Sequence, residues 1–213
     1  MIEALILYGS QARGDAGPRA DTDLLGISQN NQVEKHSFGS TSLHIYNFKD
    51  LSERSKSGDL FMIHLCLEGQ ALFDPKDHFE LLKYQLDIKR NYFSEKKRAV
   101  AIGQLVVNEF RKSKSKPFPA RRILWAIRTI IIADSVENNK FSFSTEAISN
   151  YSNMVGLFEI LRDKRITPMN DFHVEIFFEV VKKFTVFDNS IDVLNSMRED
   201  KFLLSVENEL FYE

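Results

Sequence analysis

Residues 4–14 read ALILYGSQARG, and residues 21–27 read DTDLLGI. The first stretch is a short apolar run that ends at Gly9, a pattern that predicts a buried strand followed by a tight turn. In the second stretch, Asp21 and Asp23 stand two residues apart before another apolar run. Alternate residues of a strand point to the same face, so we expect both carboxylates on one side of this strand.

The chemistry of these stretches favours a phosphate compound and a divalent cation. Gly9 permits close backbone approach, and Ser10 adds a hydroxyl beside the N–H groups of a helix start, so this turn suits the terminal phosphates of a nucleoside triphosphate. Two carboxylates, with water and substrate phosphates, suit Mg²⁺. The alternative is that Asp21 and Asp23 form a solvated turn. Because apolar residues follow Asp23, where an unpaired carboxylate costs free energy, metal binding is favoured.

Joined in this order, the two stretches resemble the signature of the DNA polymerase β-type nucleotidyltransferase superfamily. The resemblance covers about residues 5–27, and a looser similarity to short bacterial members continues through 58–61 and 64–69. It implies an α+β fold whose core is a small mixed β-sheet with flanking helices. It also implies two divalent metal ions and transfer of a nucleoside monophosphate from an NTP or dNTP to a hydroxyl group, with release of pyrophosphate.

The resemblance also implies roles for individual residues. Arg13 is expected to help neutralise the leaving pyrophosphate; alternatively, it pairs with Asp15 or Asp21 as a structural link. The assigned residues are Asp21, Asp23 and Arg13 for catalysis, Asp21 and Asp23 for Mg²⁺ or Mn²⁺, and Gly9, Ser10 and Arg13 for the nucleotide.

A third carboxylate on a later strand normally completes the metal site of this family, and here the chain departs from the pattern. The strand expected at this place covers 42–46, with Ser42, His44 and Tyr46 on one face and no Asp or Glu. His44 is either a ligand or general base, or a half-exposed strand residue. Asp50 and Asp59 follow the strand and are poorer geometric candidates.

The order of elements predicts two domains. The last expected strand, 70–73, ends before Pro75, so we expect a nucleotidyltransferase core at 1–75 and an all-α helical bundle at 76–213. Aromatic residues at helical spacing are expected in the core of the bundle. These aromatic residues are Trp125, Phe172, Phe177, Phe178, Phe184 and Phe187, and the expected helices include 60–69, 123–135, 144–151, 153–162, 169–188 and 190–198.

Composition favours an intracellular protein. The chain has 213 residues, 43% of them hydrophobic, and a single cysteine, Cys66, which we expect to be a small buried residue. No signal peptide and no apolar stretch of membrane-spanning length is recognised in the sequence. We therefore expect a cytoplasmic protein without a membrane partner.

A cationic segment at 83–128 contrasts with the net charge of −2, since it carries thirteen Lys or Arg residues against three acids. Clustered cations bind polyanions, so an oligonucleotide or another nucleic acid is a candidate ligand of this segment. Arg121 and Arg128 lie seven residues apart, nearly on one helical face, and are candidates for nucleotide binding, with Arg122 displaced from them. The alternative is a solvated cationic face.

Three hypotheses cover the acceptor. The first is template-independent oligonucleotide synthesis, as in relatives that act in bacterial anti-phage signalling. The second is nucleotidylation (AMPylation) of a small molecule or of a partner protein encoded alongside, as in antitoxin-like relatives. The third is a weakly active nucleotide-binding module, which the missing third carboxylate would favour.

Overall fold

The computed structural model describes residues 1–18, 20–30, 33–112, 118–162, 168–187, 193 and 197. The chain divides into two compact units, Met1–Arg90 and Asn91–Glu213, which are described separately below. This division falls later than the boundary expected after Pro75. The reason is that the helix following Pro75 packs on the core of the first unit through Phe79 and Leu82, both fully buried.

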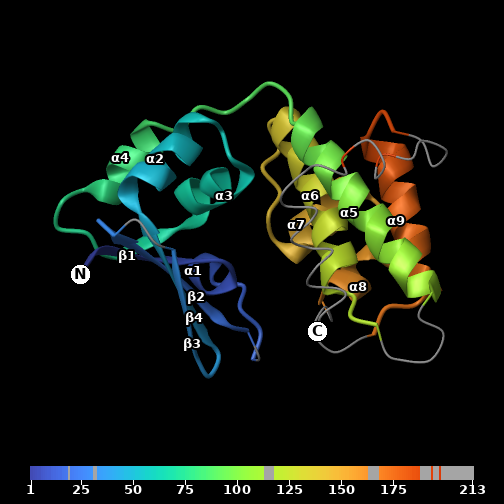
Figure 1. Cartoon of the computed structure of the whole chain (residues 1–213), viewed down its shortest axis with the longest axis horizontal. Helices are drawn as coiled ribbons and strands as arrows, with labels where there is room; N and C mark the ends of the chain where they lie inside the picture. Colours follow the sequence, from blue (N-terminus) through green and yellow to red (C-terminus); the bar gives the residue numbers. More distant parts are fainter. Residues whose placement is uncertain are drawn as a thin grey trace. The chain divides into compact units, whose positions relative to one another are not determined.

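The first unit contains a five-stranded mixed sheet, in agreement with the expected α+β class (Figure 1). The strand order is β3-β4-β2-β1-β5. β2 and β4 are parallel, whereas the pairs β1–β2, β1–β5 and β3–β4 are antiparallel. The strands are β1 (Ile2–Tyr8), β2 (Thr22–Ser28), β3 (Glu34–Phe38), β4 (Thr41–Asn47) and β5 (Gln70–Phe73).

Helices cover one face of this sheet (Figure 1). The strands present Ala4, Ile6, Leu25 and Ile27 to the helices, and all four are buried in one apolar cluster. Cys66 is buried in the same cluster, and burial raises the pKa of its thiol to about 11, as befits a small core residue. The helices of the unit are α1 (Ser10–Arg13), α2 (Phe48–Lys56), α3 (Leu60–Glu68) and α4 (His78–Tyr84).

The second unit is all-helical in its described residues, in agreement with the expected bundle (Figure 1). Phe177, Phe184 and Phe187 are buried as expected, but Phe172 is 41% exposed, so its prediction as a core residue was wrong. The helices are α5 (Phe93–Lys112), α6 (Arg121–Glu137), α7 (Thr145–Ser152), α8 (Leu157–Arg162) and α9 (Asp171–Phe184). The helix expected at 190–198 lies outside the described residues, apart from positions 193 and 197.

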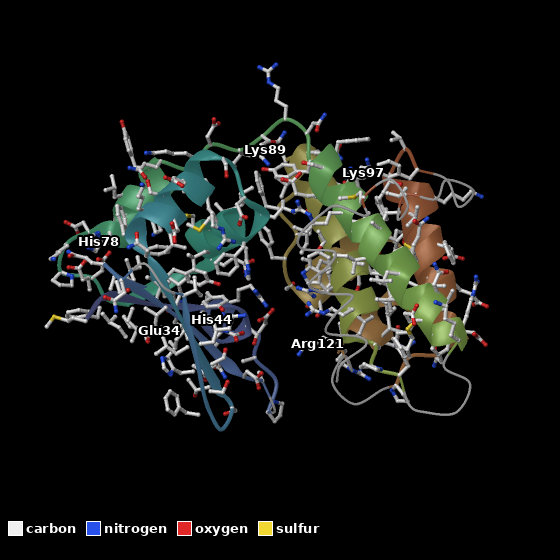
Figure 2. The ribbon with its side chains drawn as sticks, in the orientation of Figure 1. Glu34, His44, His78, Lys89, Lys97 and Arg121 are labelled. Atoms are coloured by element: carbon white, nitrogen blue, oxygen red, sulfur yellow. The ribbon has the colours of Figure 1, made fainter. Side chains whose placement is uncertain are left out.

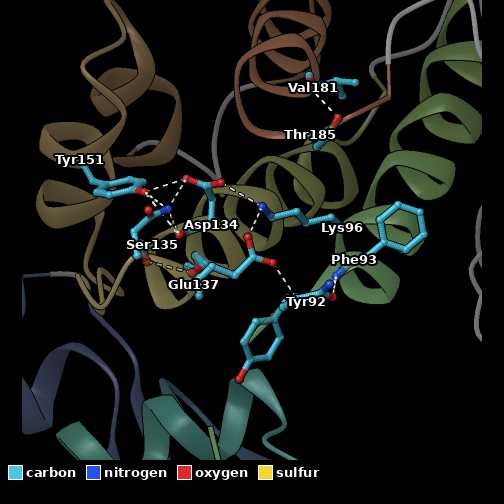
Figure 3. A network of polar contacts seen from close by, with 12 residues as sticks. Tyr92, Phe93, Lys96, Asp134, Ser135, Glu137, Tyr151, Val181 and Thr185 are labelled. Carbon is cyan, nitrogen blue, oxygen red and sulfur yellow. Dashed lines mark hydrogen bonds and ion pairs between the residues drawn. The ribbon is translucent and has the colours of Figure 1, made fainter. Parts of the chain in front are cut away.

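An ion-pair network centred on the buried side chain of Lys96 joins three helices of the second unit (Figure 3). The ammonium group of Lys96 on α5 donates to Asp134 at 2.9 Å and to Glu137 at 2.6 Å, both on α6. The hydroxyl of Tyr151 on α7 donates to the second carboxylate oxygen of Asp134 at 2.6 Å. Burial, and next the contact with Asp134, raise the pKa of Tyr151 to about 12. The network thus holds its charges in a closed set of partners.

Among the described residues, no helix is both long enough and apolar enough to cross a membrane.

Candidate functional site

The sheet brings the residues of both motifs to one of its ends. β1 ends at Tyr8, which pairs with Asp23 near the start of β2. Asp23 pairs in turn with Ser42, near the start of the parallel strand β4. On the other side of β1, Leu7 pairs with Gln70, the first residue of β5. Four segments that are far apart in sequence therefore meet at this end.

Gly9 and Asp23 lie against each other at this end. Gly9 has φ 75° and ψ −153°, a conformation open essentially to glycine alone. A Cβ atom at this position would stand 3.1 Å from Oδ2 of Asp23. The absence of a side chain at Gly9 thus matters twice, because it permits the turn and leaves room for the carboxylate. Asp21 is half-buried and precedes the first residue of β2.

Ser42 takes the place nearest to Asp23 on the neighbouring strand. Its hydroxyl donates a hydrogen bond to Oδ1 of Asp23 at 2.7 Å. His44, labelled in Figure 2, follows two residues later on the same face of β4 and is half-buried. In the described part of the chain, no group of three or more His, Cys, Asp or Glu side chains is arranged to hold a metal ion. The oxygen atoms brought together at this point include the Asp23 carboxylate and the Ser42 hydroxyl.

The charge of Asp23 affects the pKa values of two further side chains, Tyr8 and His44. Burial raises the pKa of Tyr8, and the neighbouring Asp23 and Tyr46 raise it further. Burial and the nearby Lys35 lower the pKa of His44, which Asp23 offsets only in part. Tyr8 and His44 are therefore neutral near pH 7, and neither neutralises the carboxylate.

Arg13 lies at the last residue of α1 in an ionic cluster. Its Nε donates to Asp15 at 3.1 Å and its Nη1 donates to Glu68 at 2.7 Å. The Nε2 atom of His64 is 2.9 Å from the same oxygen of Glu68. The pairing with Asp15 is the structural link that the sequence left open as the alternative for Arg13. The partner on α3, Glu68, was not anticipated.

The cationic segment at 83–128 does not act as one uniform surface. Lys83 pairs with Glu80 at 2.8 Å, and Lys112 pairs with Glu109 at 2.7 Å. Lys96 is only 8% exposed and belongs to the network of Figure 3. The segment also spans both units, and Lys114 and Lys116 lie outside the described residues. Its formal charge therefore overstates the charge available to a polyanion.

The arginines of α6 differ in their surroundings. Arg121, labelled in Figure 2, is exposed at the first residue of the helix. Arg128 is half-buried, and its Nη2 donates to the carbonyl oxygen of Phe143 at 2.8 Å. Both belong to the second unit, whereas Gly9 and Asp23 belong to the first. Their assignment to the nucleotide stays a prediction.

Comparisons with known proteins give a limited likeness. The chain matches no family model and no curated protein sequence. Among solved structures, it is similar to a nucleotidyltransferase-like protein from Exiguobacterium sibiricum 255-15, with 16% identity and a TM-score of 0.36. That match covers 98% of this chain and 74% of the other.

Proposed function

We propose that this chain is a metal-dependent nucleotidyltransferase, which moves a nucleoside monophosphate from an NTP or dNTP to a hydroxyl acceptor and releases pyrophosphate. The observation that carries the proposal is the contact between Gly9 and Asp23. A glycine turn suited to phosphate oxygens lies against a carboxylate suited to a divalent cation, and a Cβ atom would come within 3.1 Å of that carboxylate.

The donors at the end of the sheet fit Mg²⁺ or Mn²⁺. Asp21 and Asp23 would supply hard carboxylate oxygens, and Mg²⁺ usually takes one or two of these while keeping water and substrate phosphates. Two ions, as the family resemblance implies, would need more of their ligands from the substrate, since Ser42 and His44 stand where a third carboxylate is normal. When bound, the ion neutralises phosphate oxygens and stabilises the leaving group.

The protein groups around the ion would bind the phosphates and orient the aspartate. Ser10 and the backbone of Gly9 would donate hydrogen bonds to the terminal phosphates, and Arg13 would bind the leaving pyrophosphate. Ser42 fixes the orientation of Asp23 through the 2.7 Å hydrogen bond to Oδ1, which leaves Oδ2 directed towards Gly9. An acceptor hydroxyl would then attack the α-phosphorus in line with the leaving oxygen.

For the acceptor, we propose first that the chain carries out template-independent oligonucleotide synthesis, with a role in anti-phage signalling. The cationic residues that support it include Arg121, which is exposed. A second candidate, AMPylation of a partner protein or small molecule, is favoured by the ion pairs that already occupy Lys83, Lys96 and Lys112. A protein modifier needs to hold only one triphosphate, whereas a polymerising enzyme must also hold an anionic chain.

One experiment tests the activity and separates the acceptors. The purified full chain is incubated with each α-labelled triphosphate and Mg²⁺ or Mn²⁺, first alone and then with oligonucleotides or cell extract. A ladder on a denaturing gel supports oligonucleotide synthesis, whereas one labelled protein or small-molecule band supports nucleotidylation. Nucleotide binding without transfer under any of these conditions would leave a binding module and contradict the proposed activity.

Salt dependence gives an independent reading of the acceptor. Binding of an oligonucleotide should weaken steeply as salt rises, because its cationic contacts release counterions. The triple variant with Arg121, Arg122 and Arg128 changed to Gln should flatten that dependence. An unchanged slope would assign these residues to a solvated face and favour the second candidate.

A further inference from the structure

The guanidinium group of Arg13 is bound by two carboxylates. Asp15 accepts from Nε, and Glu68 accepts from Nη1. These contacts tie the end of α1 to the last turn of α3, although the two residues of the pair Arg13–Glu68 lie far apart in sequence. Arg13 and Glu68 are only 20% and 18% exposed in their side chains. A partly buried pair of this kind is costly to break, because the remaining charge loses its partner.

These two hydrogen bonds fix the orientation of the guanidinium group. An arginine head group is planar and carries five N–H donors, so holding Nε and Nη1 also fixes the plane in which Nη2 lies. In the part of the chain that the structure describes, none of the contacts of Arg13 uses Nη2. Two N–H donors therefore remain for an anionic oxygen. Lysine could not reproduce this arrangement, since its ammonium group is a point charge on a flexible stem.

Glu68 is suited to hold this position in its ionised form. Burial opposes its ionisation, but the hydrogen bonds from His64 and Arg13 outweigh burial and lower the pKa of Glu68. Nε2 of His64, on the same helix, lies 2.9 Å from Oε2 of Glu68. The ring of His64 also packs edge-on against Tyr8, with ring centroids 6.3 Å apart. Tyr8 is the residue before Gly9, so the cluster adjoins the glycine turn.

We propose that Glu68 is a positioning residue of the nucleotide site, which holds Nη1 of Arg13 so that Nη2 binds the pyrophosphate portion of the substrate. The inference rests on the proposed function, because that function supplies the anion. Glu68 itself does not touch the substrate in this scheme. Its contribution is to keep the arginine from turning away from the phosphates bound beside Gly9 and Ser10.

Calorimetric titration with magnesium pyrophosphate and, separately, with AMP tests this role in the full chain. Glu68→Ala should weaken pyrophosphate binding about tenfold, which is the lower end of the loss seen when a partner that orients a metal-binding side chain is removed. AMP affinity should not change, because AMP lacks the leaving phosphates. Glu68→Gln should recover most of the affinity, since its amide oxygen still accepts a hydrogen bond from Nη1.

Glu34→Ala is the matched control. Glu34 pairs with His36 at 3.2 Å on β3 of the same unit, so this variant also removes a glutamate that accepts from a histidine. Its pyrophosphate affinity should equal that of the wild type. A second measurement follows the Nε–H resonance of Arg13 by NMR without any ligand. The resonance should shift and broaden in Glu68→Ala but not in Glu34→Ala.

The outcomes separate the two proposals. Unchanged pyrophosphate affinity in Glu68→Ala, an equal loss for AMP and pyrophosphate, or absence of pyrophosphate binding by the wild type would each overturn the positioning role. Failure of the proposed function has another signature: the wild type binds pyrophosphate and Glu68→Ala binds it more weakly, yet the wild type transfers no label from any triphosphate to any acceptor.

Discussion

Two clusters of charge in this molecule differ in how completely the protein satisfies them. Lys96 of the second unit is 8% exposed and is bound by Asp134 and Glu137, while Tyr151 takes the other oxygen of Asp134. In the first unit, Oδ1 of Asp23 accepts one hydrogen bond from Ser42, and Oδ2 lies against the bare backbone of Gly9.

The contrast indicates a different role for each cluster. A carboxylate has about four acceptor sites, so Asp23 keeps capacity that a cation or a donor can use. In the network around Lys96, one cation is shared by two carboxylates, and Tyr151 donates to one of them, all within the helices of the second unit, which is the arrangement expected of a structural cross-link. Removal of the first cluster should cost function, and removal of the second should cost stability.

The largest effect is expected for replacement of both Asp21 and Asp23 by Ala. Turnover should fall to background, because the proposed ligands of the metal ion are lost. The melting temperature should stay near that of the wild type, since the substitutions spare the apolar core. Transfer of label from an α-labelled triphosphate measures the activity, and circular dichroism measures the melting. Normal turnover in the double variant at matched metal concentration would show that the site is misassigned.

Lys96→Met should give the opposite pattern. It leaves two carboxylates without their cation, so the free energy of unfolding should fall by about 2–4 kcal/mol, below the value for a fully buried pair because the carboxylates are about a fifth exposed. Urea denaturation measures the change, and pyrophosphate affinity in the absence of urea should stay the same. Lys97→Met, at the neighbouring half-buried position, is the control. A similar loss of unfolding free energy in both variants would contradict a structural role for the network.

Gly9→Ala should have a smaller effect that falls on both properties. The conformation of Gly9 would strain alanine by about 1–3 kcal/mol, and the new methyl group would press on Oδ2 of Asp23. We expect weaker Mg²⁺ binding by calorimetry as well as lower stability. Gly14→Ala is a matched control, because Gly14 also has positive φ, 78°, but a Cβ there meets nothing within 4 Å. Equal metal affinity in the two variants would contradict the contact with Asp23.

The smallest expected effect is on the pH dependence of stability, through the ionisation of Glu68. The pKa of Glu68 is lowered in the folded protein from an ordinary value of 4.5, so its ion pair stabilises the fold above pH 4.5 and loses that contribution as the pH falls through the lower folded value. Glu68→Gln should therefore reduce the difference in unfolding free energy between pH 7 and pH 3.5. Chemical denaturation at both pH values measures it. An unchanged difference would mean that Glu68 has the same pKa in both states.

Much of the fold could be predicted from local patterns. β1, β2, β5 and α3 were expected because each contains a short apolar run bounded by glycine, proline or polar residues, and β4 was expected because its residues alternate between two faces. β3 and α2 were missed for a physical reason. Four of the five residues of β3 are exposed, and α2 buries Leu51 together with two serines, Ser52 and Ser55, so neither shows an apolar period.

The candidate site was predictable where it depends on a motif and not where it depends on register. Gly9, Ser10, Asp21 and Asp23 lie within two short stretches, although their roles stay predictions. The bond from Ser42 to Asp23 follows from the parallel pairing of β2 with β4, which no local pattern specifies. Glu68 was hidden for a similar reason, because α3 looks like an apolar core helix until its last residue is placed beside Arg13.

The pairing of strands at the end of the sheet also limits how this site could be moved to another protein. Its pieces come from the turn after β1, the starts of β2 and β4, and the last residue of α3. A graft of the two motif peptides would carry the side chains without the partners that orient them. The smallest portable unit for protein engineering is therefore the five-stranded sheet with its helices, and a designer should place new insertions at the opposite end.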